Sequence, residues 1–300
     1  MGNAQRTRAG SAREKVAAER AAARRAQRTR RLLLAGGGIS LVLILVIVLV
    51  AVRPGRPAAP AAAQGPATGT AAQAAAVAAE VTSVPAATFD SVGAGTATGL
   101  TATAGQPLLT SAGKPEVLYM GGEYCPFCAA ERWALTAALS RFGTFTGLGL
   151  IHSSPTDVYP STPTLSFHGS RFTSKYVSFA PVEWFGQATD ASTPFGHAIL
   201  EQPTAQQTAL FSRYAGGSVP FVDIGNKYLI PQAQYLPSAL QGMSWSQVAA
   251  AMRDPGSPAA RDIDGAANII TAALCTLTNN QPATACTPTV QALEKQLAPR

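Results

Sequence analysis

Two cysteines separated by two residues are the part of this sequence with the clearest chemical meaning. They are Cys125 and Cys128, in the segment Cys-Pro-Phe-Cys. Thiols at this spacing can form and open a disulfide with little movement of the backbone. If Cys125 caps a helix and Pro126 is its first residue, the unpaired N–H groups of the first turn stabilise the Cys125 thiolate. We therefore expect Cys125 to be the nucleophile and Cys128, one turn further on, to be the resolving thiol.

The same spacing also occurs in zinc sites and in structural disulfides. A structural zinc ion needs four ligands. The sequence offers only two further cysteines, Cys275 and Cys286, which are not spaced as a ligand pair, and three histidines. We therefore favour redox chemistry and predict no metal and no cofactor, with a purely structural disulfide as the alternative.

The segments on either side of the cysteines predict how they are positioned. The apolar run at 116–120 is typical of a buried strand, and apolar side chains at helical spacing predict a helix that continues to Phe142. A second apolar run at 148–152 predicts another strand. Because a strand, a helix and a strand in succession form a unit with parallel strands, we expect the cysteines between the first strand and the helix of such a unit.

A second candidate segment is Val219-Pro220. A helix predicted at 204–215 ends at a pair of glycines, and Pro220 then opens an apolar hairpin at 219–230 whose turn is Gly-Asn. A proline that is simply tolerated at the first position of a strand would also explain this pattern.

Together these residues resemble the thioredoxin superfamily, in which a proline preceded by a cis peptide bond opens the strand after the crossover helix and faces the cysteine pair. The resemblance implies that the Val219–Pro220 bond is cis and that both residues contact the substrate beside Cys125. The Cys-Pro-aromatic-Cys motif is similar to that of glutaredoxins and, less closely, to that of periplasmic disulfide oxidases. The residue before the first cysteine is Tyr124, where thioredoxin has tryptophan.

Residues 113–147 also resemble a family of membrane-anchored, thioredoxin-like bacterial proteins that is catalogued as a domain of unknown function. The segments that carry this resemblance are 113–119, 124–129 and 131–135. It continues to the C-terminal helices over about two thirds of the chain, and it implies the fold and a compartment outside the cytoplasm. Roughly 65 residues separate the second predicted strand from Pro220, so we expect an insertion before the strand that this proline opens.

Two charged residues near the cysteines are weaker candidates. Glu123 lies two residues before Cys125 and could relay a proton to Cys128, although a solvated loop carboxylate would look the same in the sequence. Arg132 lies one helical turn beyond Cys128, where it could stabilise a thiolate or form an ion pair at the surface.

The remaining cysteines, Cys275 and Cys286, are spaced like the ends of a closed loop. In an oxidising compartment a structural disulfide is the ordinary state of such a pair. We therefore predict that they are bonded to each other, and a second pair that shuttles electrons is the alternative.

The N-terminal part predicts a membrane anchor. Residues 1–31 hold ten basic and two acidic side chains, and residues 32–52 hold no charged side chain. A helix of that length spans roughly 30 Å, which is the thickness of the hydrocarbon core of a bilayer. We therefore predict a basic cytoplasmic tail, an uncleaved transmembrane signal anchor at 32–52, and the rest of the chain outside the cytoplasm. A cleaved signal peptide and a buried core helix are the alternatives.

The rest of the chain divides into a linker and a domain. Residues 53–80 are mostly Ala, Pro, Gly, Gln and Thr, which predicts a flexible linker. The extracytoplasmic domain at 81–300 begins with a weakly β-like segment at 81–109 and ends with two helices, capped by Ser244 and Ser257. After the basic tail, 13 basic and 14 acidic side chains nearly cancel, which argues against a nucleic-acid partner.

The sequence thus predicts an α/β protein with a thioredoxin-like fold that acts as an extracytoplasmic thiol–disulfide oxidoreductase. Its partners would be protein thiols and disulfides, and the family resemblance implies a membrane partner, such as a quinone-linked oxidase, that maintains its oxidation state. Oxidation, reduction and isomerisation of disulfides are all compatible with the motif. The alternative from another class is a non-enzymatic binding module in which the cysteine pair is a fixed disulfide, and a measured reduction potential separates the two.

Overall fold

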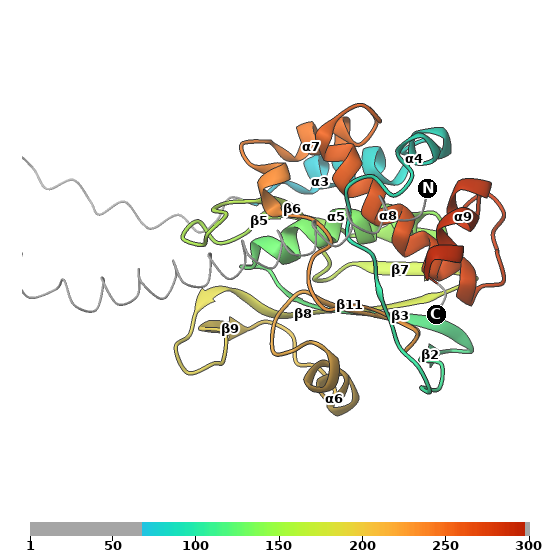
Figure 1. Cartoon of the computed structure of the whole chain (residues 1–300). Helices are drawn as coiled ribbons and strands as arrows, with labels where there is room; N and C mark the ends of the chain where they lie inside the picture. The colour runs from blue at the N-terminus through green and yellow to red at the C-terminus, as the bar shows by residue number, and fades with distance from the viewer. Residues whose placement is uncertain (1–67, 298–300) are drawn as a thin grey trace, which may run out of the picture. The chain divides into compact units, whose positions relative to one another are not determined.

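A mixed β-sheet lies at the centre of the fold, in a computed structural model that describes residues 68–297 (Figure 1). Its strands lie in the order β1–β11–β10–β3–β8–β9, and β2 pairs with the start of β3. Strands β3 and β8 are parallel, whereas the other neighbours are antiparallel. The bounds are β1 Thr101–Ala102, β2 Thr110–Ser111, β3 Lys114–Gly122, β8 Ser178–Thr189, β9 His197–Ile199, β10 Phe221–Ile224 and β11 Tyr228–Ile230.

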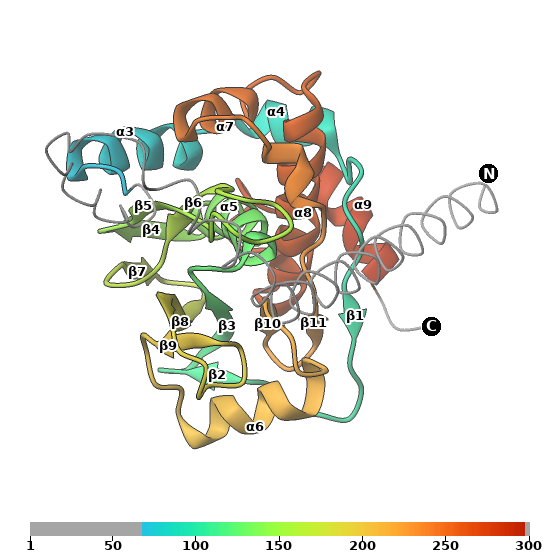
Figure 2. The same ribbon diagram turned by 90° about the vertical axis from the view of Figure 1, so that its left-hand side faces the viewer.

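Helices cover both faces of this sheet, as Figures 1 and 2 show. Helices α5 (Pro126–Ser140) and α8 (Pro258–Leu277) pack together on one face, and α6 (Ala205–Tyr214) covers the other. Successive side chains of a strand point to opposite faces. In β3, Val117 and Tyr119 accordingly join the core under α5 and α8, whereas Leu118 and Met120 pack on the side of α6. Burial on both faces explains why this strand reads as an unbroken apolar run.

Two small antiparallel sheets and several short helices complete the fold. The small sheets pair β4 (Gly143–Thr146) with β7 (Arg171–Ser174) and β5 (Gly149–His152) with β6 (Pro163–Ser166). The other helices are α3 Ala71–Thr82, α4 Ala86–Val92, the 3-10 helix η1 Pro237–Leu240, α7 Trp245–Ala251 and α9 Pro288–Leu297.

The parallel partner predicted for β3 at 148–152 is wrong. That segment forms β5, which pairs with β6 over α5, and β8 takes the place beside β3. The β5–β6 hairpin is held on the helix because Trp133 Nε1 donates to Pro163 O at 3.0 Å and Thr164 Oγ1 donates to Ala129 O at 2.9 Å. Leu150 and Ile151 of β5 are therefore buried outside the central sheet, where β5 lies between β6 and α3. The insertion was predicted to lie between the second parallel strand and Pro220. Part of it instead lies before β8, between α5 and this strand.

The domain begins with helices over residues 71–92, in contrast to the linker predicted to reach residue 80 and to the first part of the β-like segment predicted at 81–109. The later part of that segment contains β1, which pairs with β11 at the edge of the sheet. Helix α3 starts with a capping box at Thr70, and α4 follows it directly. Three small apolar side chains of α3 are buried, at Ala74, Val77 and Val81. This spacing of three and four residues places them on one face, and alanine is the best helix former. The Ala-rich composition that was interpreted as a linker therefore encodes a packed helix.

Other local predictions are confirmed. Ser244 and Ser257 cap α7 and α8, and the β10–β11 turn has Gly225 at φ 64° and Asn226 at φ 57°. Within residues 68–297, no helix combines the length and the apolar character needed to cross a membrane. The predicted basic tail, the predicted anchor at 32–52 and the linker up to residue 67 lie outside the described residues.

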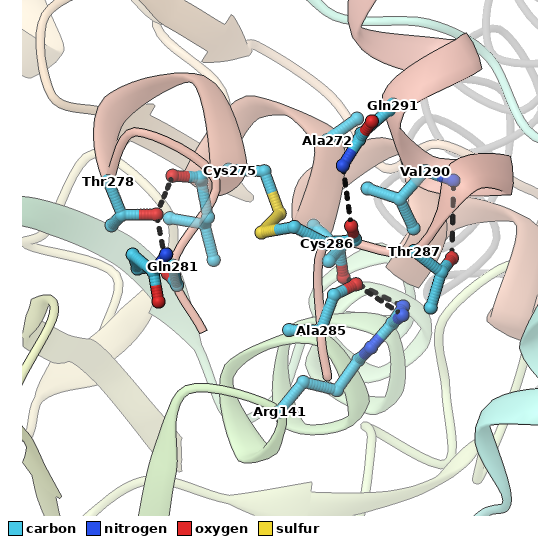
Figure 3. Close-up of a disulfide and its surroundings, with 12 residues drawn as sticks. Arg141, Ala272, Cys275, Thr278, Gln281, Ala285, Cys286, Thr287, Val290 and Gln291 are labelled. Atoms are coloured by element: carbon cyan, nitrogen blue, oxygen red, sulfur yellow. Dashed lines mark hydrogen bonds between the residues drawn. A yellow bond between two sulfur atoms is a disulfide. The ribbon is translucent and has the colours of Figure 1, made fainter. Parts of the chain in front are cut away.

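A disulfide joins Cys275 near the end of α8 to Cys286, as predicted, with the two Cα atoms 5.7 Å apart (Figure 3). The loop that it closes is also held from α5, because Arg141 Nη2 donates to Ala285 O at 2.8 Å. On the C-terminal side, Gln291 Nε2 donates to Cys286 O at 2.9 Å. The disulfide and the hydrogen bond from Arg141 attach the segment that carries α9 to the rest of the domain, and the hydrogen bond from Gln291 fixes the start of α9 against Cys286.

Candidate functional site

Cys125 is the N-cap residue of α5, as the sequence predicts. Its Sγ accepts a hydrogen bond from the backbone N–H of Cys128 at 3.3 Å. Pro126 occupies the first helical position, where a missing N–H has no cost. The sulfur of Cys125 thus lies at the positive end of the helix dipole, beside the N–H groups of the first turn that have no partner within the helix.

The two thiols, both free in the structure, differ in their access to solvent. Cys125 keeps 5% of its surface exposed and Cys128 keeps 0%. A thiol with no exposure cannot meet an external disulfide without movement of its surroundings, but it can attack a neighbouring sulfur. This difference supports the assignment of Cys125 as the thiol that meets the substrate.

The pKa of the Cys128 thiol is raised well above its ordinary value. The largest cause is burial, and the neighbouring Cys125 raises it further. Two groups act in the opposite direction, namely the positive charge of Arg132 and the backbone N–H of Gly122, which donates to Cys128 Sγ at 3.5 Å. Cys128 is therefore a thiol that needs help from its surroundings to ionise.

The loop before β10 lies directly beside the cysteines. The Cys125 thiol donates to the carbonyl oxygen of Val219, with the sulfur and the oxygen 3.8 Å apart, and the Val219–Pro220 bond is cis, as predicted. The chain reaches this position from α6 through Gly216 and Gly217, which have φ of 59° and 74°. Left-handed values of this kind favour glycine. Residues more than ninety positions apart in the sequence are thus neighbours at the candidate site.

Aromatic side chains surround the cysteine pair. Tyr124 and Phe185 are buried with the two cysteines in one cluster, and further apolar residues that pack against it are partly exposed: Phe127, Trp184, Phe195 and Val219. Tyr124 also stacks on His197, with ring centroids 3.7 Å apart. Sequence reasoning did not identify Trp184, Phe195 or His197 as neighbours of the cysteines. The concentration of aromatic residues between 184 and 195 is the feature that could have pointed to them.

Glu123 points toward β6. Its Oε1 accepts a hydrogen bond from Ser166 Oγ at 2.7 Å, and its backbone oxygen accepts one from Gln187 Nε2 at 2.8 Å. The role of Glu123 as a proton relay for Cys128 stays a prediction.

Arg132 is fully buried, so the interpretation of this residue as part of a surface ion pair is wrong. Its Nε and Nη2 donate to the two carboxylate oxygens of Glu183 on β8, at 2.8 and 2.6 Å. Sequence reasoning missed Glu183. The only carboxylate within β8 and the only basic residue within α5 are the pattern that could have paired them.

The fold and the site define a mixed α/β protein with a Cys-x-x-Cys pair at the N-terminus of a buried helix. Residues 103–276 match the family described as "Domain of unknown function (DUF929)", and the chain belongs to this family. Neither the curated proteins nor the solved structures contain a match.

Proposed function

We propose that the domain is a thioredoxin-like thiol–disulfide oxidoreductase that acts outside the cytoplasm through Cys125 and Cys128. The topology supports the thioredoxin-like assignment. Strands β8 and β3 are parallel, β10 is antiparallel to β3, and β11 is antiparallel to β10. The hairpin that Pro220 opens therefore lies beside the strand that precedes the cysteines, as the superfamily resemblance implies for a proline that faces the cysteine pair. The turn after β3 leads to Cys125 and the start of α5. Helices α5 and α8 lie on the same face of the sheet.

One observation carries the chemical part of the proposal. Cys125 Sγ lies at the N-terminus of α5, retains some exposure, and lies 3.8 Å from the carbonyl oxygen of Val219 in the loop that opens β10. A polypeptide in extended conformation could place its own backbone against this loop and its sulfur against Cys125. Val219 and Pro220 are accordingly the proposed substrate contacts.

The proposed exchange balances as follows for a substrate disulfide R–S–S–R′. The Cys125 thiolate attacks one sulfur, forms a mixed disulfide with R–S and releases R′–S⁻. The Cys128 thiolate then attacks Cys125 Sγ, which closes the Cys125–Cys128 disulfide and releases R–S⁻. The protein dithiol loses two electrons and two protons, and the substrate gains them as R–SH and R′–SH. The reverse sequence oxidises a substrate dithiol.

The compartment is part of the proposal. A structural disulfide such as Cys275–Cys286 persists in an oxidising environment, and the predicted anchor at 32–52 would hold the domain outside the membrane. Repeated turnover as an oxidase requires a membrane partner that accepts two electrons, such as a quinone-linked oxidase. Turnover as a reductase requires a dithiol donor in its place.

Trapping of intermediates in the full-length protein tests the proposal. Cys128→Ser should still attack substrates but cannot resolve them, so disulfide-linked adducts with extracytoplasmic proteins should accumulate. Cys125→Ser is the matched control and should form none. A binding module with a fixed disulfide would show neither effect. The proposal fails if Cys128→Ser forms no adduct and the reduced wild-type protein leaves a model disulfide unreacted.

A further inference from the structure

A buried ion pair lies beside the cysteines. Both Arg132 and Glu183 have 0% side-chain exposure, and two hydrogen bonds join them in the forked geometry of an arginine–carboxylate pair. Glu183 is itself fixed from two sides, because its Oε1 also accepts from the backbone N–H of Phe167 at 3.2 Å and its own N–H donates to Glu201 Oε2 at 2.8 Å. The position of the guanidinium is therefore set by the fold and not by solvent.

Burying such a pair is expensive, and stability alone rarely accounts for it. Well-packed apolar residues in place of a buried ion pair are often neutral or stabilising. The pair here is also not saturated, because Arg132 Nη1 is buried and has no hydrogen-bond partner among residues 68–297. A buried cationic group with an unused donor next to a redox pair indicates a role in the chemistry of that pair.

Contacts through Gly122 connect Arg132 to both cysteines. Arg132 Nη2 donates to the carbonyl oxygen of Gly122 at 2.9 Å, and the same oxygen accepts from the backbone N–H of Cys125 at 3.1 Å. The N–H of Gly122 donates to Cys128 Sγ at 3.5 Å. Because Nη2 contacts both the Glu183 carboxylate and Gly122 O, the guanidinium lies between the carboxylate and the turn that carries the cysteines.

We propose that Arg132, fixed by Glu183, is a positioning residue that stabilises the Cys128 thiolate when this thiolate attacks the mixed disulfide on Cys125. This inference rests on the proposed function. It adds the group that allows a buried Cys128 to ionise for the second step of the exchange, the attack on the mixed disulfide. In that step Cys128 loses a proton, its thiolate bonds to Cys125 Sγ, and the departing R–S⁻ takes up a proton to leave as R–SH.

The charges around Cys128 support this assignment. Burial raises the pKa of Cys128, and the positive charge that opposes it is that of Arg132. The other titratable groups that interact with Cys128 are Tyr119 on β3, Tyr124 in the turn and Cys125. Burial raises the pKa of both tyrosines, so they are neutral at physiological pH. Glu183 contributes the negative charge on the far side of Arg132.

The test uses the full-length protein with Cys125→Ser, so that Cys128 can be titrated alone by the ultraviolet absorbance of its thiolate. Arg132→Met combined with Glu183→Leu removes the pair without leaving a lone buried charge. We expect the thiolate fraction at a fixed pH below the pKa to fall about threefold, because the charge of Arg132 acts on Cys128 and its loss outweighs the simultaneous loss of the opposing charge of Glu183 on the far side. Arg141→Met, at the other end of α5, is the matched control and should leave the titration unchanged.

A second variant should shift the pKa of Cys128 in the opposite direction. Glu183→Gln keeps an acceptor for Arg132 but removes the negative charge, so Cys128 should ionise at lower pH than in the parent. A purely structural role would change the titration in the same direction in both variants, or not at all, and either result would overturn the proposal. If the double variant does not fold, Glu183→Gln decides alone: an unchanged or raised pKa contradicts the proposal.

The same variants with Cys125 restored test the kinetic consequence. Release of a mixed disulfide should slow about threefold at neutral pH in the double variant and recover at alkaline pH, in line with the thiolate fraction. The titration needs no substrate, so it reports on Arg132 even if the protein performs no exchange. Conversely, a wild-type protein that fails to react with a model disulfide contradicts the proposed function and leaves the titration result standing.

Discussion

The backbone N–H of Cys128 donates to Cys125 Sγ at 3.3 Å, so the candidate nucleophile is also the cap of its own helix. This double role predicts a separation of stability from activity. Serine is among the best N-cap residues and alanine is a poor one. We therefore expect Cys125→Ala to lower the free energy of unfolding by about 1 kcal/mol relative to Cys125→Ser, while both variants lack exchange activity. Urea denaturation together with a thiol–disulfide exchange assay measures both effects, and equal stabilities would refute the capping role.

A buried carboxylate in the hairpin predicts a pH dependence of stability. Burial raises the pKa of Asp223 on β10 from 3.8 to about 6, against the effect of a hydrogen bond from the N–H of Asn226. The folded state therefore holds this proton more tightly than the unfolded state does. Burial of the ionised carboxylate lowers the free energy of unfolding. This loss of stability is complete above about pH 6 and disappears as the pH falls toward 3.8.

Asp223→Asn keeps the acceptor for Asn226 and removes the charge. We expect it to raise the free energy of unfolding by roughly 1–3 kcal/mol at neutral pH. It should have little effect at a pH low enough to protonate Asp223 in both the folded and the unfolded wild-type protein. Urea denaturation of the two proteins across this pH range gives the difference. A constant difference at every pH would mean that the carboxylate does not titrate as described.

The Cys275–Cys286 disulfide predicts a loss of stability when it is removed. It closes a loop between residues 11 positions apart, so the chain-entropy estimate gives about 3 kcal/mol. We expect the combined variant Cys275→Ala and Cys286→Ala to lose about this amount, with a larger change in the C-terminal segment than in the sheet. Hydrogen exchange resolves the two regions. Peptide mapping of the non-reduced wild type must show the bond, and free thiols there would refute it.

Helix α3 predicts that residues before 81 contribute to the stability of the domain. Val81 is 1% exposed and packs in the main core. We expect Val81→Ala to cost roughly 1–3 kcal/mol through lost apolar burial and the cavity left behind. Ala75→Ser on the exposed face of the same helix should change stability by a few tenths of a kcal/mol. Equal effects of the two variants in thermal denaturation would place this segment in a linker, as its composition first suggested.

The proposed compartment predicts a protease protection pattern. Ten basic residues before the predicted anchor should keep the N-terminus in the cytoplasm. Protease added to intact spheroplasts should therefore remove the domain at 81–300 and leave the basic tail. Protection of the domain in intact spheroplasts, with digestion after lysis, would contradict the orientation and the redox environment at once.

The features that the sequence determined by itself are local. Cys125 as a cap with Pro126 behind it, the Gly225-Asn226 turn and the start of α8 at Ser257 each depend on the conformation of a few consecutive residues. Capping hydrogen bonds and left-handed turn residues are determined within one turn of chain, so a short motif is sufficient to predict them. The pairing of Cys275 with Cys286 belongs to the same group, since the two residues are close in sequence.

The tertiary structure decided which distant segments meet. An apolar strand can be buried equally well in the central sheet or against a helix, so burial patterns could not distinguish β5 from β8 as the partner of β3. The ion pair of Arg132 and Glu183 joins residues 51 positions apart, and no local preference relates them. Whether Arg132 lies at the surface or in the interior depends on the tertiary structure, because only the folded chain brings the Glu183 carboxylate within hydrogen-bond distance of the Arg132 guanidinium.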